Sequence, residues 1–155
     1  MNSSLVVRSA EASDLGVLVE GNRMMAVESE GKQLDLAVLT RGVQRALDDP
    51  QRGRYLVAES DNRVIGQLMV TSEWSDWRDG WFWWIQSVYV AKDFRRKGIY
   101  RRLYAHLREE AQRTSGVCGL RLYVEKENEP AIATYESLGM VDAGYRLYEV
   151  VWPSE

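Results

Sequence analysis

Residues 88–101, VYVAKDFRRKGIYR, decide the fold, because in them an apolar strand ends, a basic turn follows and a helix begins. A helical stripe of apolar side chains follows Gly98: Ile99, Leu103, Leu107 and Ala111. The first N–H groups of a helix lack intrahelical partners and lie at the positive end of its dipole, so this junction can hold an anion. Gly98 would let the backbone approach that anion closely.

Five cations surround this turn: Arg95, Arg96, Lys97, Arg101 and Arg102. They can add charge-assisted contacts to a pyrophosphate, but they exceed what one pyrophosphate can use, so some must be solvated. The alternative interpretation is an ordinary solvated connection in which Gly98 only interrupts the chain before an amphipathic helix.

The rest of the chain predicts one α+β domain over residues 1–155. Helical spacing of apolar side chains and end signals predict a helix from Ser13–Asp14 to Gly31, and three others: Asp35–Leu47, the helix after Gly98, and Ala131–Leu138. Apolar and β-branched runs predict strands at Leu5–Val7, Tyr55–Ala58, Val64–Thr71, Trp81–Val90, Gly119–Val124 and Tyr145–Trp152. We therefore expect a mixed central sheet of six to seven strands flanked by about four helices.

Composition excludes several classes of function. The net charge of -3, from 20 Lys and Arg against 23 Asp and Glu, argues against a nucleic-acid partner. Cys118 and His106 are the only Cys and His, so we expect no disulfide and no metal site. No apolar run is long enough to span a membrane and no secretory signal is evident, so we expect a soluble, cytoplasmic protein with no membrane partner.

Arg95-Arg96-Lys97-Gly98-Ile99-Tyr100 resembles the signature Gln/Arg-x-x-Gly-x-Gly/Ala of the GCN5-related N-acetyltransferase (GNAT) superfamily. It matches at the first and fourth positions, while Tyr100 replaces the small sixth residue and must point its ring away or tilt the cofactor. The resemblance implies acetyl-CoA as co-substrate. It implies that the backbone of Val88, Tyr89 and Val90 pairs with the pantetheine arm, and that the amides from Arg96 to Arg101 hold the pyrophosphate.

Residues 128–140, NEPAIATYESLGM, resemble the second motif of the same superfamily, in which Asn precedes Ala-x-x-x-Tyr-x-x-x-Gly-Phe/Met. Ala131 and Tyr135 share one helix face at this spacing. The resemblance implies that Asn128 contacts the cofactor's arm and that Tyr135 protonates the departing thiolate. The alternatives are a helix cap or turn residue for Asn128 and a half-buried aromatic with a solvated hydroxyl for Tyr135.

Amine acetylation needs a neutral nitrogen, so a carboxylate must receive the ammonium proton directly or through water. The candidates are Glu28 and Glu30 at the end of the first helix, and Glu73 and Asp76 after the third strand, because both segments border the acceptor in this family. We favour Glu73. The alternative for each is a solvated loop carboxylate.

Five of the six Trp lie in residues 73–87, EWSDWRDGWFWWIQS. Alternation sends Trp81, Trp83 and Ile85 to one face of the strand, and Phe82, Trp84 and Gln86 to the other. We place Trp74 and Trp77 in a loop at 72–80, where with Asp76 they could form a wall for a cationic or aromatic amine, and we expect Gln86 to orient that acceptor. The alternative is that these rings only cover a wide sheet surface.

The leading hypothesis is direct acetyl transfer from acetyl-CoA to a primary amine of a small molecule or peptide in a ternary complex. A covalent route is disfavoured because Cys118 and His106 are a poor pair for it. The second hypothesis is an acyl-CoA-binding sensor or interaction module without turnover, which Tyr100 favours and Tyr135 and Asn128 oppose. A nucleic-acid-binding domain is a third. Exposed aromatics and the last strand would allow a homodimer.

Overall fold

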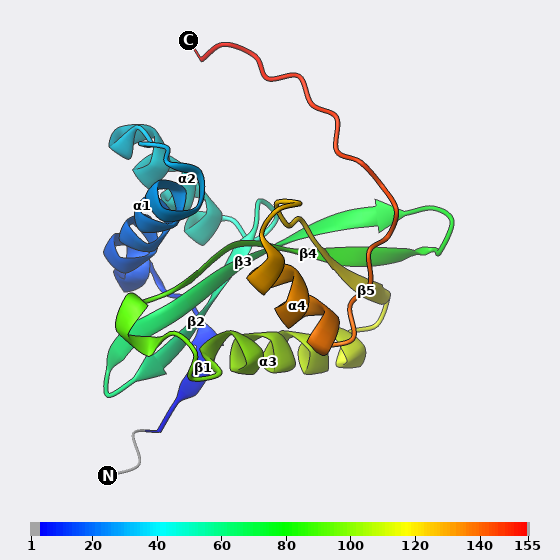
Figure 1. Cartoon of the computed structure of the whole chain (residues 1–155), viewed down its shortest axis with the longest axis horizontal. Coiled ribbons are helices and arrows are strands. Elements are labelled where there is room, and N and C mark those ends of the chain that lie inside the picture. Colours follow the sequence, from blue (N-terminus) through cyan, green and yellow to red (C-terminus); the bar gives the residue numbers. More distant parts are fainter. Residues whose placement is uncertain (1–3, 155) are drawn as a thin grey trace. The chain divides into compact units, whose positions relative to one another are not determined.

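The computed structural model describes residues 4–154, in two compact units, Met1–Tyr123 and Val124–Glu155. The first unit holds a five-stranded sheet in the order β1-β2-β3-β4-β5 (Figure 1). Its strands are β1 (Val6–Ser9), β2 (Arg54–Ser60), β3 (Arg63–Ser75), β4 (Gly80–Val90) and β5 (Val117–Leu122). The first four pair antiparallel and β5 pairs parallel to β4, so the predicted mixed sheet is confirmed.

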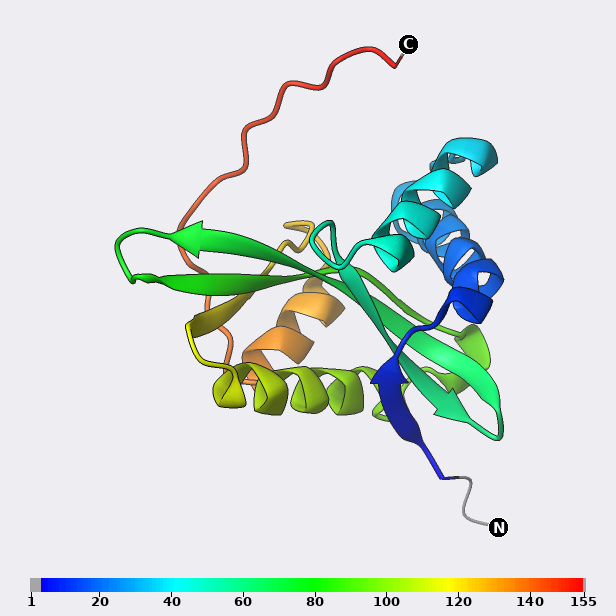
Figure 2. The same cartoon turned by 180° about the vertical axis from the view of Figure 1, so that it is seen from behind.

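The helices of the first unit cover both faces of this sheet (Figures 1 and 2). Helices α1 (Leu15–Glu30) and α2 (Leu36–Asp48) lie on one face, and α3 (Ile99–Arg113) lies on the other. Two adjacent residues of β3, Gln67 and Gly66, show which helix lies on which face of the sheet. The Gln67 amide donates to the carbonyl of Leu18 in α1 at 3.2 Å, whereas a Cβ at Gly66 would lie 2.8 Å from Cγ2 of Ile99.

The core forms where these layers meet. The largest fully buried apolar side chains are Leu18, Leu56, Val57, Leu68, Leu103 and Leu107. They come from both helical layers and from the central strands, as the apolar spacing of each element requires. The 3-10 turns η1 (Ala12–Asp14) and η2 (Lys92–Phe94) precede α1 and α3, and the second unit contains α4 (Glu129–Ser137).

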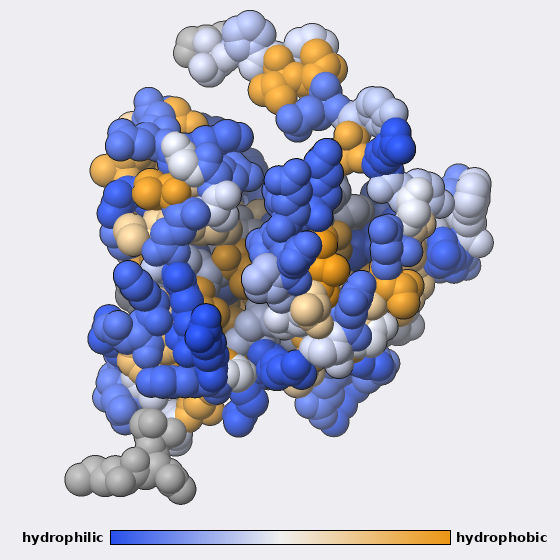
Figure 3. Space-filling view, viewed as in Figure 1, coloured by the Kyte–Doolittle hydropathy of each residue, from blue (hydrophilic) through white to orange (hydrophobic). Residues whose placement is uncertain are grey.

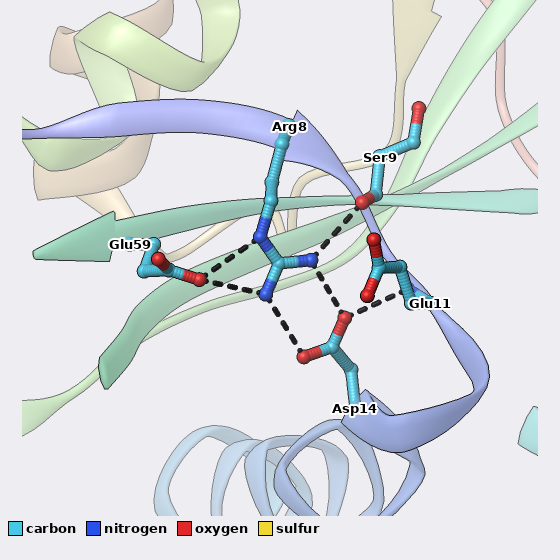
Figure 4. Close-up of polar contacts among 5 residues, drawn as sticks. All are labelled: Arg8, Ser9, Glu11, Asp14 and Glu59. Atoms are coloured by element: carbon cyan, nitrogen blue, oxygen red, sulfur yellow. Dashed lines mark hydrogen bonds and ion pairs between the residues drawn. The ribbon is translucent and has the colours of Figure 1, made fainter. Parts of the chain in front are cut away.

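A partly buried ion cluster ties β1 to β2 and to the start of α1 (Figure 4). The Arg8 guanidinium donates to Asp14 at 2.8 and 3.1 Å and to Glu59 at 2.8 and 2.9 Å. Asp14 also accepts from the backbone N–H of Glu11 at 2.7 Å. Asp14 is the N-cap residue of α1, but its side chain makes no capping hydrogen bond to that helix, because Arg8 and Glu11 occupy it.

Two sequence predictions need correction. The described residues contain five strands rather than six or seven, because Tyr145–Trp152 forms none. A strand needs a hydrogen-bonded neighbour, and no sheet pairing among residues 4–154 involves a residue after Leu122. The expected loop at 72–80 is much shorter, since β3 continues to Ser75 and β4 begins at Gly80. The single domain over 1–155 stays a prediction.

Candidate active site

Strand β4 carries a bulge just before the basic turn. Met69 of β3 pairs with Gln86, but Gln67 pairs with Tyr89, so Leu68 faces two residues of β4, Ser87 and Val88. Ser87 adopts a left-handed φ of 51°, a strained conformation for a residue with a side chain. Because of the extra residue, Gln86 and Tyr89 face the same side of the sheet although three positions separate them.

Strands β4 and β5 separate immediately before this bulge. Their parallel pairing ends at Ile85 and Leu122, whereas β4 continues to Val90. Among the described strands, residues 86–90 therefore have a neighbour on the β3 side only. The predicted pantetheine-pairing segment, Val88 to Val90, lies in this region, where the edge of β4 is available to an extended ligand.

The turn after β4 contains two residues in the left-handed conformation. Arg96 has a φ of 60° and Gly98 a φ of 78°, and Gly98 is the N-cap residue of α3, with no side chain to cap it. Ile99, Tyr100 and Arg101 form the first turn of α3, so the predicted segment lies at the positive end of a helix dipole.

Arg95 joins this turn to the end of α1. Its guanidinium donates to Glu28 at 2.5 Å and to the carbonyl of Val90 at 2.9 Å, and it lies 5.4 Å from the ring centroid of Tyr89. The structure thus brings together Glu28, a predicted acceptor residue, and Arg95, a predicted cofactor residue. An Arg held by a carboxylate and a carbonyl positions the turn before any ligand arrives.

The remaining residues of the turn have distinct neighbours. Tyr100 packs its ring beside Tyr104, one helical turn along α3, with centroids 6.3 Å apart. Lys97 lies over the ring of Phe94 at 5.5 Å. Arg102 donates to the carbonyl of Leu5 at 3.3 Å and so contacts the β1 end of the unit. Arg95, Lys97 and Arg102 therefore each contact another residue of the same unit.

Polar and aromatic side chains continue from the bulge along the α1 face of the sheet. Gln86 donates to the hydroxyl of Thr71 at 2.6 Å, which fixes the orientation of its amide. Beyond it, the rings of Trp84 and Tyr123 lie 4.5 Å apart. Gln67 marks this face, and alternation along β3 places Met69, Thr71 and Glu73 on it as well.

Glu73 lies farther out on the same face and forms an ion pair. Its carboxylate accepts from Arg121 of β5 at 2.6 Å, and the Arg121 guanidinium stacks 3.6 Å from the ring centroid of Phe82. The side chain of Glu73 remains about half exposed, at 46%. Glu73 therefore belongs to a strand rather than to the expected loop, and any proton it receives must be accommodated beside a fixed cation.

Trp74, Asp76 and Trp77 do not join this face as predicted. Trp74 follows Glu73 in β3, so its side chain points to the opposite face, where it packs edge-on against Trp81 at 5.0 Å. Trp74 is thus not a loop residue. Asp76 and Trp77 lie in the short turn between β3 and β4, and Trp77 is 86% exposed. The aromatic pair on the α1 face of the sheet is instead Trp84 with Tyr123.

The second unit carries the two other predicted residues. Asn128 is the N-cap of α4, and its side-chain oxygen accepts from the N–H of Ala131 at 3.3 Å, so the capping role considered from the sequence is confirmed. Tyr135 lies within α4, and burial raises the pKa of its hydroxyl. Tyr135 therefore keeps its proton at neutral pH, as a proton donor must.

Two residues of this face, Thr71 and Arg121, could not have been chosen from the sequence. Thr71 and Arg121 are ordinary strand residues whose partners depend on the register between strands. Ser87 offered a weak signal, because Gln86 and Ser87 are adjacent polar residues inside an apolar run.

Within residues 4–154, no group of three or more His, Cys, Asp or Glu side chains is placed to hold a metal ion. No helix in the same described part is long and apolar enough to cross a membrane.

Comparison with known proteins identifies the family. Residues 24–140 match the model of the Acetyltransferase (GNAT) family. A crystal structure of "a possible acetyltransferase" from Clostridium difficile 630 is 45% identical, covers 97% of this chain and 99% of its own, and superposes with a TM-score of 0.90.

More distant relatives carry more specific names. The "[Ribosomal protein bS18]-alanine N-acetyltransferase" of Salmonella typhimurium is 45% identical over 60 residues, which are 39% of this chain and 40% of that protein. The match thus spans only two fifths of this curated relative. Aminoglycoside N-acetyltransferase AAC(6')-Iy, solved in complex with CoA, is 13% identical and shares the fold, with a TM-score of 0.77 over 97% of each chain.

Proposed function

Because the chain belongs to the GNAT family and is an acyltransferase, we propose that it transfers an acetyl group from acetyl-CoA to a primary amine. The transfer is direct, within a ternary complex of enzyme, acetyl-CoA and amine. The observation that carries this proposal is the junction of β4 and α3. There a strand edge without a β5 neighbour leads into a turn with left-handed Arg96 and Gly98 at the start of a helix.

In this proposal the cofactor lies along that junction. The pantetheine arm pairs with the backbone of Val88 to Val90 in the manner of an added strand. The pyrophosphate is held by N–H groups between Arg96 and Arg101, at the end of the α3 dipole. The bulge at Ser87 supports this arrangement, because a bulge redirects the backbone groups that follow it.

The acceptor amine is assigned to the α1 face of the sheet beside the bulge. Gln86, held by Thr71, offers a fixed amide for orienting it, and Trp84 with Tyr123 offers aromatic surface for a cationic or apolar neighbour. Glu73 is the proposed proton acceptor, acting directly or through water. Glu28, which lies at the end of α1, is likewise paired with a cation, Arg95.

Tyr135 is proposed to donate a proton to the departing thiolate of CoA. Its raised pKa supports this role, since the phenol is still protonated at a pH where amines begin to lose theirs. A thiol leaves readily, so positioning and charge stabilisation account for most of the benefit. The named relatives act on a ribosomal-protein alanine and on aminoglycosides, so both an N-terminal amine and an amino sugar belong among the acceptors to test.

The test is amine-dependent release of CoA thiol from acetyl-CoA. An alanine-terminated peptide, an aminoglycoside and a diamine are each compared with an acceptor-free reaction. The proposal expects at least one amine to raise the rate well above that background. If acetyl-CoA binds but none of a broad amine panel increases thiol release, the sensor hypothesis replaces the enzyme.

The variant Glu73→Gln tests whether Glu73 accepts the proton of the amine. Its matched control is Glu109→Gln, because Glu109 lies on the exposed side of α3 in an ion pair with Arg113. We expect Glu73→Gln to slow turnover at neutral pH and to recover partly at higher pH, where more amine is already neutral. An equal loss at every pH would mean that Glu73 has no role in removing the proton.

A further inference from the structure

One ion pair joins the basic turn, Arg95 to Gly98, to a helix far away in the sequence. The Arg95 guanidinium donates to the carboxylate of Glu28, in the last turn of α1, 67 residues earlier. Both side chains are partly shielded, at 39% and 32% exposure, whereas the pair of Arg23 with Glu20 within α1 is 42% and 57% exposed. In Figure 3 the surface over the turn is blue, since three cations follow one another there: Arg95, Arg96 and Lys97. A carboxylate beside these cations reduces their attraction for a pyrophosphate.

Helix α1 is a fixed platform for Glu28. Its middle lies directly on β3, where the carbonyl of Leu18 accepts from the Gln67 amide and a Cβ at Gly21 would collide with that same amide. Gln67 is only 2% exposed, so this contact is buried. Glu28 follows Gly21 by seven residues, or two helical turns, so it lies on the same sheet-facing side about 10 Å farther along the helix. The Glu28 side chain therefore extends from a helix whose distance from the sheet is already set.

Arg95 uses another of its donors to close the connection between β4 and α3. Its Nε–H donates to the carbonyl of Val90, the last residue of β4, at 2.9 Å. Its guanidinium also lies 5.4 Å from the ring centroid of Tyr89, which pairs with Gln67 across the sheet. One planar side chain thus links the end of β4, the start of the basic turn and the end of α1. The Glu28 carboxylate is the partner that ties this connection to the helix.

The basic turn needs such support, because its second residue is strained. Arg96 has a left-handed φ of 60°, a conformation that residues with a side chain rarely adopt and that persists only where the surrounding structure imposes it. Arg95 itself is extended, with a φ of -71° and a ψ of 155°, so the backbone changes from extended to left-handed between these two residues. Two hydrogen bonds to the guanidinium of Arg95 restrain the chain at this change of conformation.

We propose that Glu28 is a positioning residue for acetyl-CoA: through Arg95 it keeps the basic turn in the conformation whose N–H groups hold the pyrophosphate. This inference rests on the proposed function, in which the pyrophosphate lies between Arg96 and Arg101. It gives Glu28 a role at the cofactor instead of the role at the acceptor that the sequence predicted.

A purely electrostatic role of Glu28 would have the opposite effect on binding. Removal of its charge leaves the turn more positive, which by itself would tighten the binding of an anion. Loss of positioning instead weakens binding, because the N–H groups of the turn are no longer held in place. The sign of the change in acetyl-CoA affinity therefore separates the two roles.

The first test is isothermal titration of acetyl-CoA into the intact chain and into its Glu28→Gln variant. The variant should bind about three- to tenfold more weakly than wild type. Glu30→Gln is the matched control: it removes a charge at the same end of α1, but Glu30 pairs with the exposed Lys32, at 3.2 Å, so the affinity should equal that of wild type. Unchanged or tighter binding by Glu28→Gln overturns the inference and leaves the proposed function standing. A wild-type chain that does not bind acetyl-CoA overturns both.

The second test is a double-mutant cycle that shows whether Glu28 acts through Arg95. Arg95→Gln alone should weaken acetyl-CoA binding, and the addition of Glu28→Gln should weaken it no further, since the carboxylate then has no guanidinium to hold. Independent, additive losses would overturn the inference.

Steady-state kinetics with an amine that supports turnover gives a further measurement. Glu28→Gln should raise the KM for acetyl-CoA and leave kcat at saturating acetyl-CoA nearly unchanged, because only the binding of the cofactor is impaired. A lower kcat at an unchanged KM would assign Glu28 to the acceptor and overturn its positioning role.

Discussion

Asp14 shows how one side chain can matter more for stability than its place at a helix start suggests. It is 7% exposed and accepts from Arg8 and from the N–H of Glu11 (Figure 4). Asp14→Asn should lower the free energy of unfolding by about 2 kcal/mol, because the partly buried Arg8 loses one of its two charged partners. Urea unfolding measures this, and Glu20→Gln, in the exposed pair with Arg23, should leave the midpoint unchanged.

The same carboxylate predicts a pH dependence of stability. The hydrogen bonds from Arg8 hold the pKa of Asp14 below its ordinary value, whereas in the unfolded chain it titrates near about 3.9. Its contribution is therefore complete above that pH and is lost as the pH falls through the lower pKa of the folded state. The stability difference between wild type and Asp14→Asn should shrink between pH 5 and pH 2, and a difference that grows there would contradict the ion pair.

Tyr135 gives a prediction about chemistry. Tyr135→Phe removes only the hydroxyl, so turnover should fall roughly tenfold to a hundredfold while the KM for acetyl-CoA changes little. Steady-state kinetics at saturating amine measures both quantities. Tyr145→Phe, an exposed tyrosine of the same unit, should behave as wild type. An equal loss in affinity and turnover would assign Tyr135 to cofactor binding instead of proton donation.

At the scale of the element, the start of α3 depends on a glycine that no other residue replaces without strain. Gly98 has a φ of 78°, and a Cβ built there meets no atom within 4 Å, so only backbone strain opposes a substitution. Gly98→Ala should destabilise the fold by about 1 kcal/mol and weaken CoA binding through the displaced turn. Gly42→Ala is the control, because Gly42 lies inside α2 with the same open space and no left-handed φ, and it should stabilise by about 0.5–1 kcal/mol. Thermal unfolding compares the stability of the two variants. An equal effect of both substitutions would show that the left-handed backbone of Gly98 does not oppose a side chain.

The sequence predicted those elements whose signals are local. The spacing of Leu36, Leu39 and Val43 defined α2 to within one residue at each end, and the R-x-x-G turn located the start of α3. The bulge at Ser87 and the partners Thr71 and Arg121 could not be predicted, because they depend on which residues of different strands lie opposite one another. The extended β3–β4 hairpin was missed because Ser72, Glu73 and Ser75 are polar, although the pairing of Trp74 with Trp81 supports it.

For the whole molecule, cofactor binding should raise thermal stability. A ligand present at 100 times its Kd stabilises the folded state by about 2.7 kcal/mol, which for a chain of this size corresponds to a rise in Tm of roughly 5–10 °C. Differential scanning fluorimetry with acetyl-CoA measures this shift. Adenosine, which lacks the pyrophosphate and the pantetheine arm, should produce almost none, and an equal shift with adenosine would place the binding energy outside the β4–α3 junction.

The central claim is that the junction of β4 and α3 is an acetyl-CoA site, and isothermal titration of the intact chain with acetyl-CoA tests it most directly. We predict one acetyl-CoA bound per chain with a Kd between about 1 μM and 1 mM, the range in which enzymes commonly hold their substrates. Gly98→Ala should weaken that binding and Gly42→Ala should not. Absence of any heat of binding at millimolar acetyl-CoA would contradict the account.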